Sequence, residues 1–318
     1  MRFLNATLLG LIALVFWATS VAFTRSLSET LGPTMLVAVS FGGAGLISLS
    51  VELWRYRKIR VLSPPSWKYL VYCGVFFMCY SFGYVPALAM ARDRQIVLQL
   101  GVVNYLWPGL IVLGSVFILK YRARWLFLIP GIIIAFFGIA VCMAGRFSLG
   151  LFYNAIRENR LAFGLIAGSA ICWAVYSNNA HKYAPKSRGS GMPLFQLATS
   201  LVFFVIYMAF GAKVSWKPAL IGPLLYYMVF VSSLSYLLWD IAMQKGQIVF
   251  LGAVSYLLPL VSTLFAGWYF NERLGFHLLA GAVLVMLGAI LSRYGVVTKV
   301  SCESRDRLRH LSAQIPDT

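Results

Sequence analysis

Tryptophan and serine recur at helical spacing in two apolar stretches of the chain. Trp17 and Ser20 are three residues apart, and Trp173 and Ser177 are four apart. Residues three or four apart share one face of a helix, so each stretch presents an indole beside a hydroxyl. An indole packs against a flat ring, and a hydroxyl hydrogen-bonds a small polar group. These faces predict non-covalent recognition of an aromatic, weakly polar ligand.

Further aromatic and uncharged polar residues extend this pattern. Tyr80 and Tyr84 share one helical face, and Tyr236 and Trp239 lie close together on another stretch. The candidate residues of a substrate cavity are Trp17, Ser20, Tyr80, Tyr84, Gln99, Trp107, Trp173, Ser177, Tyr236, Trp239 and Ser255. Aromatic residues at helical spacing also serve as packing or as an interfacial belt. We favour a cavity because both Trp-Ser faces fall near the middle of their stretches.

Charged side chains are absent from the middles of the apolar stretches. A fixed charge there is usual in ion-coupled pumps and anion carriers, so a neutral or zwitterionic solute, moved by facilitated diffusion or exchange, fits better. Asp240 and Glu272, near the ends of two stretches, are the candidates for coupling or gating. We nevertheless expect an interfacial position for each, beside Lys245 and Arg273.

Cysteine and histidine form no catalytic or metal-binding pattern in the sequence. The five cysteines lack metal-type spacing, and His181, His277 and His310 are far apart. We expect no metal, no cofactor and no enzymatic activity. A membrane-embedded transferase, the alternative from another functional class, would need a catalytic His, Asp or metal set.

One proline-centred element occurs twice, with tyrosine three residues before proline at Tyr105/Pro108 and at Tyr256/Pro259. Within a helix, proline removes a hydrogen bond and its ring displaces the carbonyl four residues back. A break in a membrane helix is tolerated where it is buried in protein or lines a wet cavity. The two prolines are therefore candidate hinges beside a central site. The alternative is a pair of tolerated kinks.

The composition is that of an integral membrane protein. Of the 318 residues, 60% are hydrophobic and 11% are charged, and the mean hydropathy is +0.80. The net charge of +18 comes from Lys and Arg between apolar stretches, which is how membrane proteins set their orientation. We therefore expect a lipid bilayer, and no nucleic acid, as the partner.

Ten apolar windows are each long enough to span a bilayer. They fall at about 5–24, 33–52, 67–90, 95–119, 125–145, 161–180, 191–212, 218–240, 247–270 and 275–292. Matching residues in the two halves are offset by 156 positions at Trp17 and Trp173, drifting to 150 at Gly131 and Gly281. Such a slow drift indicates a duplicated unit. The first window is then a helix of that unit rather than a cleaved signal peptide.

The duplication predicts an all-α membrane fold of ten transmembrane helices in two inverted five-helix repeats, because an odd number of helices reverses the second copy. The repeats are expected at 1–145 and 161–292, with a connecting loop at 146–160 and a cytoplasmic tail at 293–318. Eighteen basic residues fall on the side of the termini and nine on the other. This bias places both termini in the cytoplasm.

Glycines seven residues apart mark the fifth and tenth windows, at Gly131 and Gly138 and at Gly281 and Gly288. Small residues two turns apart let helices approach closely. We expect these helices to pack inside the molecule as scaffold, with a homodimer contact as the alternative.

The chain resembles the drug/metabolite transporter superfamily, in its ten-helix EamA branch, over residues 1–293. The resemblance rests on Phe16-Trp17-Ala18-Thr19-Ser20, its echo at Trp173, both Tyr-x-x-Pro elements and Asn271-Glu272-Arg273-Leu274. Within the branch, Asn104-Tyr105-Leu106-Trp107-Pro108 and the aromatic faces are most similar to bacterial aromatic amino acid exporters. Lys120 and Tyr121 stand where the first half would hold a counterpart of Glu272, which argues against a symmetric role for that residue.

The resemblance implies a multi-pass exporter of the bacterial inner membrane. Its expected substrates are Trp, Phe, Tyr and other neutral amino acids, carried by alternating access through a central cavity. The alternative is efflux of drugs or quaternary cations of the paraquat type, with proton coupling. Sugar-phosphate carriers are disfavoured because phosphate recognition calls for Arg or Lys within the cavity.

Overall fold

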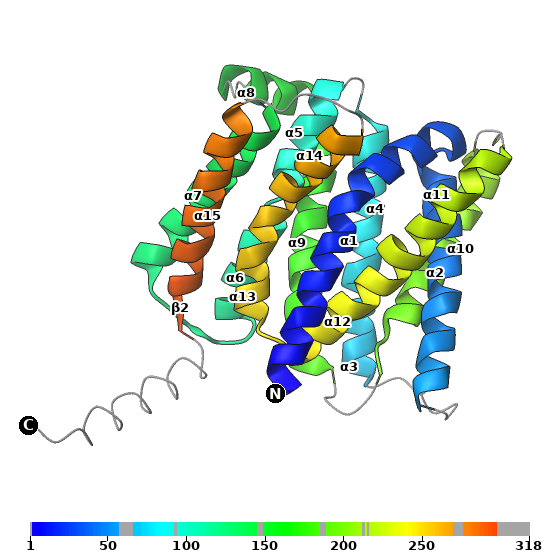
Figure 1. Cartoon of the computed structure of the whole chain (residues 1–318), viewed down its shortest axis with the longest axis horizontal. Helices are drawn as coiled ribbons and strands as arrows, with labels where there is room; N and C mark the ends of the chain where they lie inside the picture. The colour runs from blue at the N-terminus through cyan, green and yellow to red at the C-terminus, as the bar shows by residue number, and fades with distance from the viewer. Residues whose placement is uncertain are drawn as a thin grey trace, which may run out of the picture.

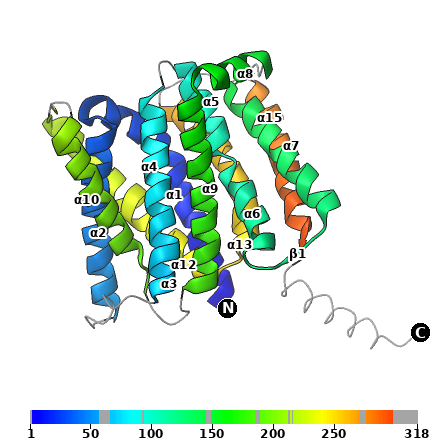
Figure 2. The same cartoon turned by 180° about the vertical axis from the view of Figure 1, so that it is seen from behind.

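The computed structural model describes residues 2–56, 66–91, 94–144, 149–184, 189–211, 214, 216–269 and 276–297. Helices run nearly parallel or antiparallel through a single bundle, as Figures 1 and 2 show from opposite sides. The first half holds α1 (Arg2–Leu31), α2 (Pro33–Tyr56), α3 (Trp67–Tyr69), η2 (Leu70–Gly74), α4 (Val75–Ala89), α5 (Arg94–Asn104), α6 (Trp107–Phe117), β1 (Arg122–Ala123) and α7 (Trp125–Ala144).

The second half begins after a connecting helix, α8 (Leu149–Glu158). It holds α9 (Arg160–Tyr183), α10 (Met192–Phe210), η3 (Pro218–Leu220), α11 (Ile221–Tyr226), η4 (Tyr227–Leu234), α12 (Ser235–Lys245), α13 (Ile248–Val254), η5 (Ser255–Leu257), α14 (Leu258–Tyr269), α15 (Phe276–Tyr294) and β2 (Val296–Val297). The expectation that 146–160 is a plain loop is wrong, because Phe152, Ala155 and Ile156 recur at helical spacing and α8 packs them on Phe163 of α9.

Seven of the described helical segments are long and apolar enough to cross a membrane, and three shorter apolar helices accompany them. The three shorter ones are Asn5–Ser20, Trp125–Val141 and Ile248–Ser262. Each of the ten predicted windows overlaps one of these segments. A membrane protein made of helices is thereby confirmed, while the ten-span inverted repeat stays a prediction.

Both proline elements interrupt their helices, as predicted. α5 ends at Asn104 and α6 begins at Trp107, while α13 gives way at Ser255 to the 3-10 turn η5 before α14 begins. The two breaks are neighbours, since a Cβ placed on Gly109 would lie 2.2 Å from the Tyr256 hydroxyl oxygen. Because Gly109, next to Pro108, has no side chain, the two interrupted helices contact each other where each is broken.

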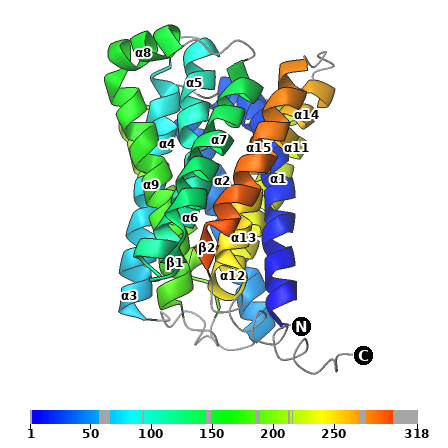
Figure 3. The ribbon, with the colours of Figure 1, turned by 90° about the vertical axis from the view of Figure 1, so that its left-hand side faces the viewer.

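The helices α7 and α15 pack side by side at one edge of the bundle (Figure 3). A Cβ on Gly131 would lie 2.3 Å from the Ser292 backbone nitrogen, and one on Gly288 would lie 2.3 Å from that of Ala135. Backbone contact this close requires glycine on both helices. The predicted internal packing of these two glycine pairs is confirmed.

Both ends of the described chain lie at one end of the bundle. The N terminus of α1 and the short antiparallel sheet of β1 and β2 are at the bottom of Figure 1, whereas α8 is at the top. The starts of α3 and α7 and the end of α12 are also at the bottom. We call this the terminal side of the molecule, and it is the side that carries the basic residues Lys68, Lys120, Arg122, Arg124, Lys182, Lys245 and Arg293.

Candidate functional site: an aromatic cluster above a buried carboxylate

Aromatic side chains from five helices meet in the interior. Trp17 of α1 has its ring centroid 5.6 Å from Trp173 of α9, 5.1 Å from Tyr236 and 5.3 Å from Trp239. Tyr236 and Trp239 lie on α12, so rings from α9 and α12 contact Trp17 of α1. The sequence-predicted residues are thus brought together across both halves of the chain.

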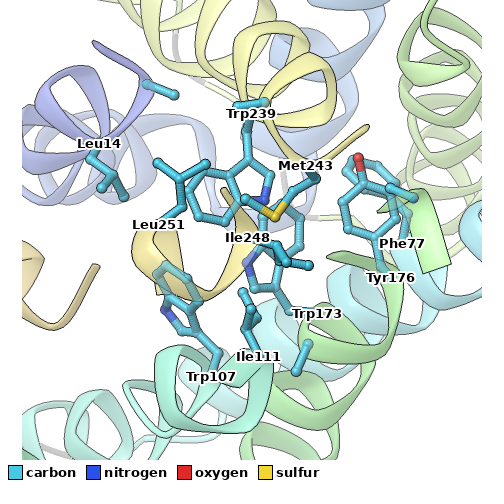
Figure 4. Close-up of a cluster of buried hydrophobic side chains, with 14 of the residues drawn as sticks. Leu14, Phe77, Trp107, Ile111, Trp173, Tyr176, Trp239, Met243, Ile248 and Leu251 are labelled. Carbon is cyan, nitrogen blue, oxygen red and sulfur yellow. The ribbon is translucent and has the colours of Figure 1, made fainter. Parts of the chain in front are cut away.

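Trp173 is the centre of this aromatic cluster. Its ring centroid lies 4.9 Å from Tyr80 of α4, 5.7 Å from Tyr236 and 6.4 Å from Trp107 of α6. Figure 4 shows the indoles of Trp107, Trp173 and Trp239 close together among buried apolar side chains. Removing Trp173 would leave the other rings without their common neighbour.

The cluster changes in burial from one side to the other. Trp107, Trp173 and Trp239 are at most 5% exposed. Trp17, Tyr80 and Tyr236 are partly exposed, and Tyr84 extends the same surface by stacking on Tyr80 at 5.7 Å. Rings that face one another from different helices and yet keep accessible surface provide contact area for a ligand.

The three predicted serines all make hydrogen bonds inside the protein. Ser20 donates to the Trp17 carbonyl at 2.6 Å, and Ser255 donates to the Leu251 carbonyl at 2.7 Å. Ser177 accepts the Trp239 indole N–H at 3.3 Å and so fixes that ring. Ser177 orients the Trp239 ring, whereas Ser20 and Ser255 each donate their hydroxyl proton to a backbone carbonyl three or four residues earlier.

Three buried polar atoms on α1 and α5 have no hydrogen-bond partner among the described residues. They are the indole nitrogen of Trp17, the amide oxygen of Gln99 and the amide oxygen of Asn104. Trp17 provides a donor within the aromatic cluster, and the two amides provide acceptors on α5. A buried polar atom without a partner is costly, so a bound ligand with both donors and acceptors would be stabilised here.

Asp240 is buried, contrary to the expected interfacial position beside Lys245. Its side chain is 0% exposed and accepts hydrogen bonds from Tyr69 at 2.9 Å and Tyr176 at 2.7 Å. Ser190 donates to it at 2.5 Å and Gln244 at 2.7 Å. Tyr69, Ser190 and Gln244 donate to Oδ2 and Tyr176 donates to Oδ1, so both carboxylate oxygens have protein partners. Gln244 lies on α12 with Asp240, whereas Tyr69, Tyr176 and Ser190 come from other parts of the chain.

These five residues form a carboxylate hub, which joins α3, α9 and α12 with the segment before α10. All four elements meet on the terminal side (Figure 2). Two more α9 residues connect the halves of the chain nearby. Asn178 donates to the Ile111 carbonyl, and Asn179 donates to the Tyr72 carbonyl. The terminal side of the bundle is therefore closed by buried polar contacts between the two halves of the chain.

The sequence analysis named Asp240 but missed its partners, and no local spacing connects Tyr69, Tyr176 or Ser190 to it. A usable signal was present in Tyr176-Ser177-Asn178-Asn179, four polar side chains in succession inside an apolar helix. Such residues in a membrane span face the interior and find partners there. The second candidate for coupling, Glu272, lies outside the described residues. Among the residues that the structure describes, no cluster of three metal-ligating side chains occurs.

Replacing Asp240 with asparagine is expected to loosen the terminal side. An amide offers one acceptor oxygen and turns a donor toward the hub, at a cost of about 1–3 kcal/mol. Cys73, which is 0% exposed on η2 next to the hub, reports this opening. Its labelling by a thiol reagent should become roughly 5–150-fold faster, the factor that corresponds to this free energy. Glu29→Gln on exposed α1 surface is the control, and equal Cys73 labelling in both variants would contradict the closing role.

Comparison with known proteins shows which family the chain resembles. The EamA-like transporter family matches residues 4–144 and 160–294. Aromatic amino acid exporter YddG of Escherichia coli (strain K12) is 30% identical over 300 residues, covering 90% of this chain and 96% of that protein. The exporter of the same name from Salmonella typhimurium is 29% identical over 296 residues, with the same two coverages.

Other relatives agree with this result. Uncharacterized transporter YvbV of Bacillus subtilis is 25% identical over 298 residues. A solved crystal structure superposes on 91% of this chain with a TM-score of 0.75 and 26% identity. The chain therefore belongs to the EamA-like transporter family, as a multi-pass membrane transporter rather than an enzyme.

Proposed function

We propose that the protein exports aromatic amino acids across the bacterial inner membrane, with the aromatic cluster as the substrate site. The observation that carries the proposal is the set of partly exposed rings around the unpartnered indole N–H of Trp17. An aromatic side chain would stack within the cluster, and the carboxylate of the amino acid would accept a hydrogen bond from the Trp17 indole N–H. The names of the two exporters similar to this chain support this substrate class.

The proposed transport cycle is alternating access by two inverted five-helix repeats, 1–145 and 161–292, with both termini and the tail at 293–318 in the cytoplasm. Pro108 and Pro259 are the proposed hinges, and the adjacent helix breaks support them. The carboxylate hub would close the cytoplasmic side while substrate leaves outward. Opening toward the cytoplasm then requires the hydrogen bonds of the carboxylate hub to break.

We further propose facilitated diffusion or exchange as the transport mode. Asp240 is a buried carboxylate, contrary to the expectation that the interior holds no fixed charge. Four protein donors hydrogen-bond Asp240, three at Oδ2 and one at Oδ1, and hold the carboxylate among its protein partners on the terminal side. Asp240 then acts in closure, not in carrying a proton.

Efflux of a flat organic cation is the second candidate, because the same rings could bind a cation through their faces and Asp240 lies beside the cluster at Trp239. Paraquat and tryptophan are the two probes that separate the candidates. Binding of tryptophan and phenylalanine to the purified protein, without binding of paraquat, supports amino acid export. Binding of paraquat alone would overturn it.

Replacing Trp17 with phenylalanine is expected to weaken tryptophan binding. The ring remains, but the indole N–H is lost, and one such hydrogen bond contributes about 0.5–1.5 kcal/mol. We expect a dissociation constant roughly 2–13-fold higher in isothermal titration calorimetry. Trp54→Phe, at a position 80% exposed on α2, is the matched control. A Trp17→Phe protein that binds tryptophan as tightly as this control would remove Trp17 from the site.

A further inference from the structure

A hollow of about 800 Å³ is lined by residues none of which belongs to the aromatic cluster. Its walls are α13 and η5 on one side and α15 on the other, and Met286 and Ile290 in its lining are exposed. The residues that line it include Phe250, Val254, Leu257, Met286 and Ile290, all apolar. We call it the lateral groove. Nothing in the proposed transport cycle uses it.

Two guanidinium groups close the terminal end of this groove. Arg124 follows β1 and Arg293 precedes β2, and the pairing of β1 with β2 brings them to the same place. The Arg124 backbone N–H donates to the Gly295 carbonyl at 2.7 Å, and Arg293 donates to the Val296 carbonyl at 3.4 Å. The groove lining contains no acidic residue. Its charged end therefore suits an anion with several oxygen acceptors.

The apolar walls require an occupant with a hydrocarbon part. Met286 is 44% exposed and Ile290 is 55% exposed on the outer face of α15, where a membrane would supply acyl chains. From Arg293 to Met286 the groove follows two turns of α15, about 10 Å at 1.5 Å per residue. That length reaches about one third of the way through a hydrocarbon core of about 30 Å. A free phosphate would leave these walls uncovered.

We propose that the lateral groove binds an acidic phospholipid of the leaflet on the terminal side. The phosphate lies between Arg124 and Arg293, and one acyl chain lies along Leu257 and Ile290. Charge complementarity selects this occupant, since basic pockets between helices on the basic side of a membrane protein attract anionic head groups. The lipid would also bridge α15 to α13, which continues into the broken helix at Ser255.

Native mass spectrometry of the purified protein tests the proposal with phosphatidylglycerol and phosphatidylcholine as probes. We expect retention of one phosphatidylglycerol in preference to phosphatidylcholine. The double variant Arg124→Gln/Arg293→Gln should lower that retention roughly tenfold or more. Ile290→Asn, which leaves both guanidiniums in place, should lower it as well. The control is Lys68→Gln/Lys182→Gln, two exposed cations on the same side, which should retain the lipid as wild type does.

Four outcomes would overturn the proposal. Equal retention of the two lipids would show that the head-group charge is not recognised. Equal loss of phosphatidylglycerol in the control and in the Arg124/Arg293 variant would show that the whole basic side, and not the groove, attracts the lipid. Binding of inorganic phosphate that depends on both arginines but is indifferent to Ile290→Asn indicates an anion site without lipid. A dimer mass that Ile290→Asn abolishes assigns the groove to a second copy of the chain. Unchanged elution and melting temperature confirm that each variant is folded.

Discussion

Replacing Trp173 with alanine is expected to reduce exchange of aromatic amino acids at least 100-fold. Trp173 contacts Trp17, Tyr80, Trp107 and Tyr236, so its loss disconnects rings that come from different helices. Each aromatic pair contributes about 0.5–1.5 kcal/mol beyond burial, and two such pairs already account for a change of roughly 5–150-fold. Loss of the contact surface for the substrate adds to this. Initial exchange rates in proteoliposomes measure the effect.

The matched control for this prediction is Trp268→Ala, which removes an indole that is 75% exposed on α14. Trp173→Phe should restore part of the rate because it keeps a ring at the centre of the cluster. Both substitutions at Trp173 also open space in the core, so rates are compared at equal amounts of folded, monodisperse protein. A Trp173→Ala rate within threefold of wild type would remove the aromatic cluster from the transport site.

Replacing Gly288 with leucine is expected to prevent stable folding. A Cβ at this position would lie 2.3 Å from the Ala135 backbone nitrogen and 2.6 Å from the Gly131 carbonyl oxygen. Neither backbone atom can move unless α7 and α15 separate, and overpacking costs 1–3 kcal/mol even where side chains can adjust. We expect a loss of at least about 3 kcal/mol, seen as a large fall in melting temperature or as lost yield.

Gly164→Leu on α9 provides the control, because no atom lies within 4 Å of a Cβ built there. It should melt close to wild type, which separates the effect of close packing from the effect of removing a helical glycine. Similar melting temperatures for the Gly288 and Gly164 variants would show that α7 and α15 are not held at backbone contact.

The sequence was informative wherever a feature is local or duplicated. Hydropathy placed the apolar helical segments, and the Tyr-x-x-Pro elements placed the helix breaks, because proline acts on the turn that contains it. The two Trp-Ser faces predicted an inward position for Trp17 and Trp173, and the structure brings their rings within 5.6 Å. Repetition of a pattern in both halves was therefore a stronger guide than any single aromatic residue.

Features that depend on distant contacts were not predictable. Asp240 was expected at the membrane interface because Lys245 is near it in sequence, yet its partners Tyr69 and Tyr176 come from other helices. Burial depends on tertiary packing, which spacing along one helix does not encode. The lateral groove was missed for the same reason, since Arg124 and Arg293 lie in different halves and meet only through β1 and β2.

Counterflow in proteoliposomes tests the central claim most directly. Vesicles preloaded with unlabelled tryptophan, with the same pH and no membrane potential across them, are given labelled tryptophan outside. Our account predicts that label accumulates transiently inside, that external phenylalanine suppresses it, and that vesicles with the Trp173→Ala protein remain at the level of protein-free vesicles. Wild-type vesicles that take up no label, while taking up labelled paraquat or requiring an imposed pH gradient, would contradict it.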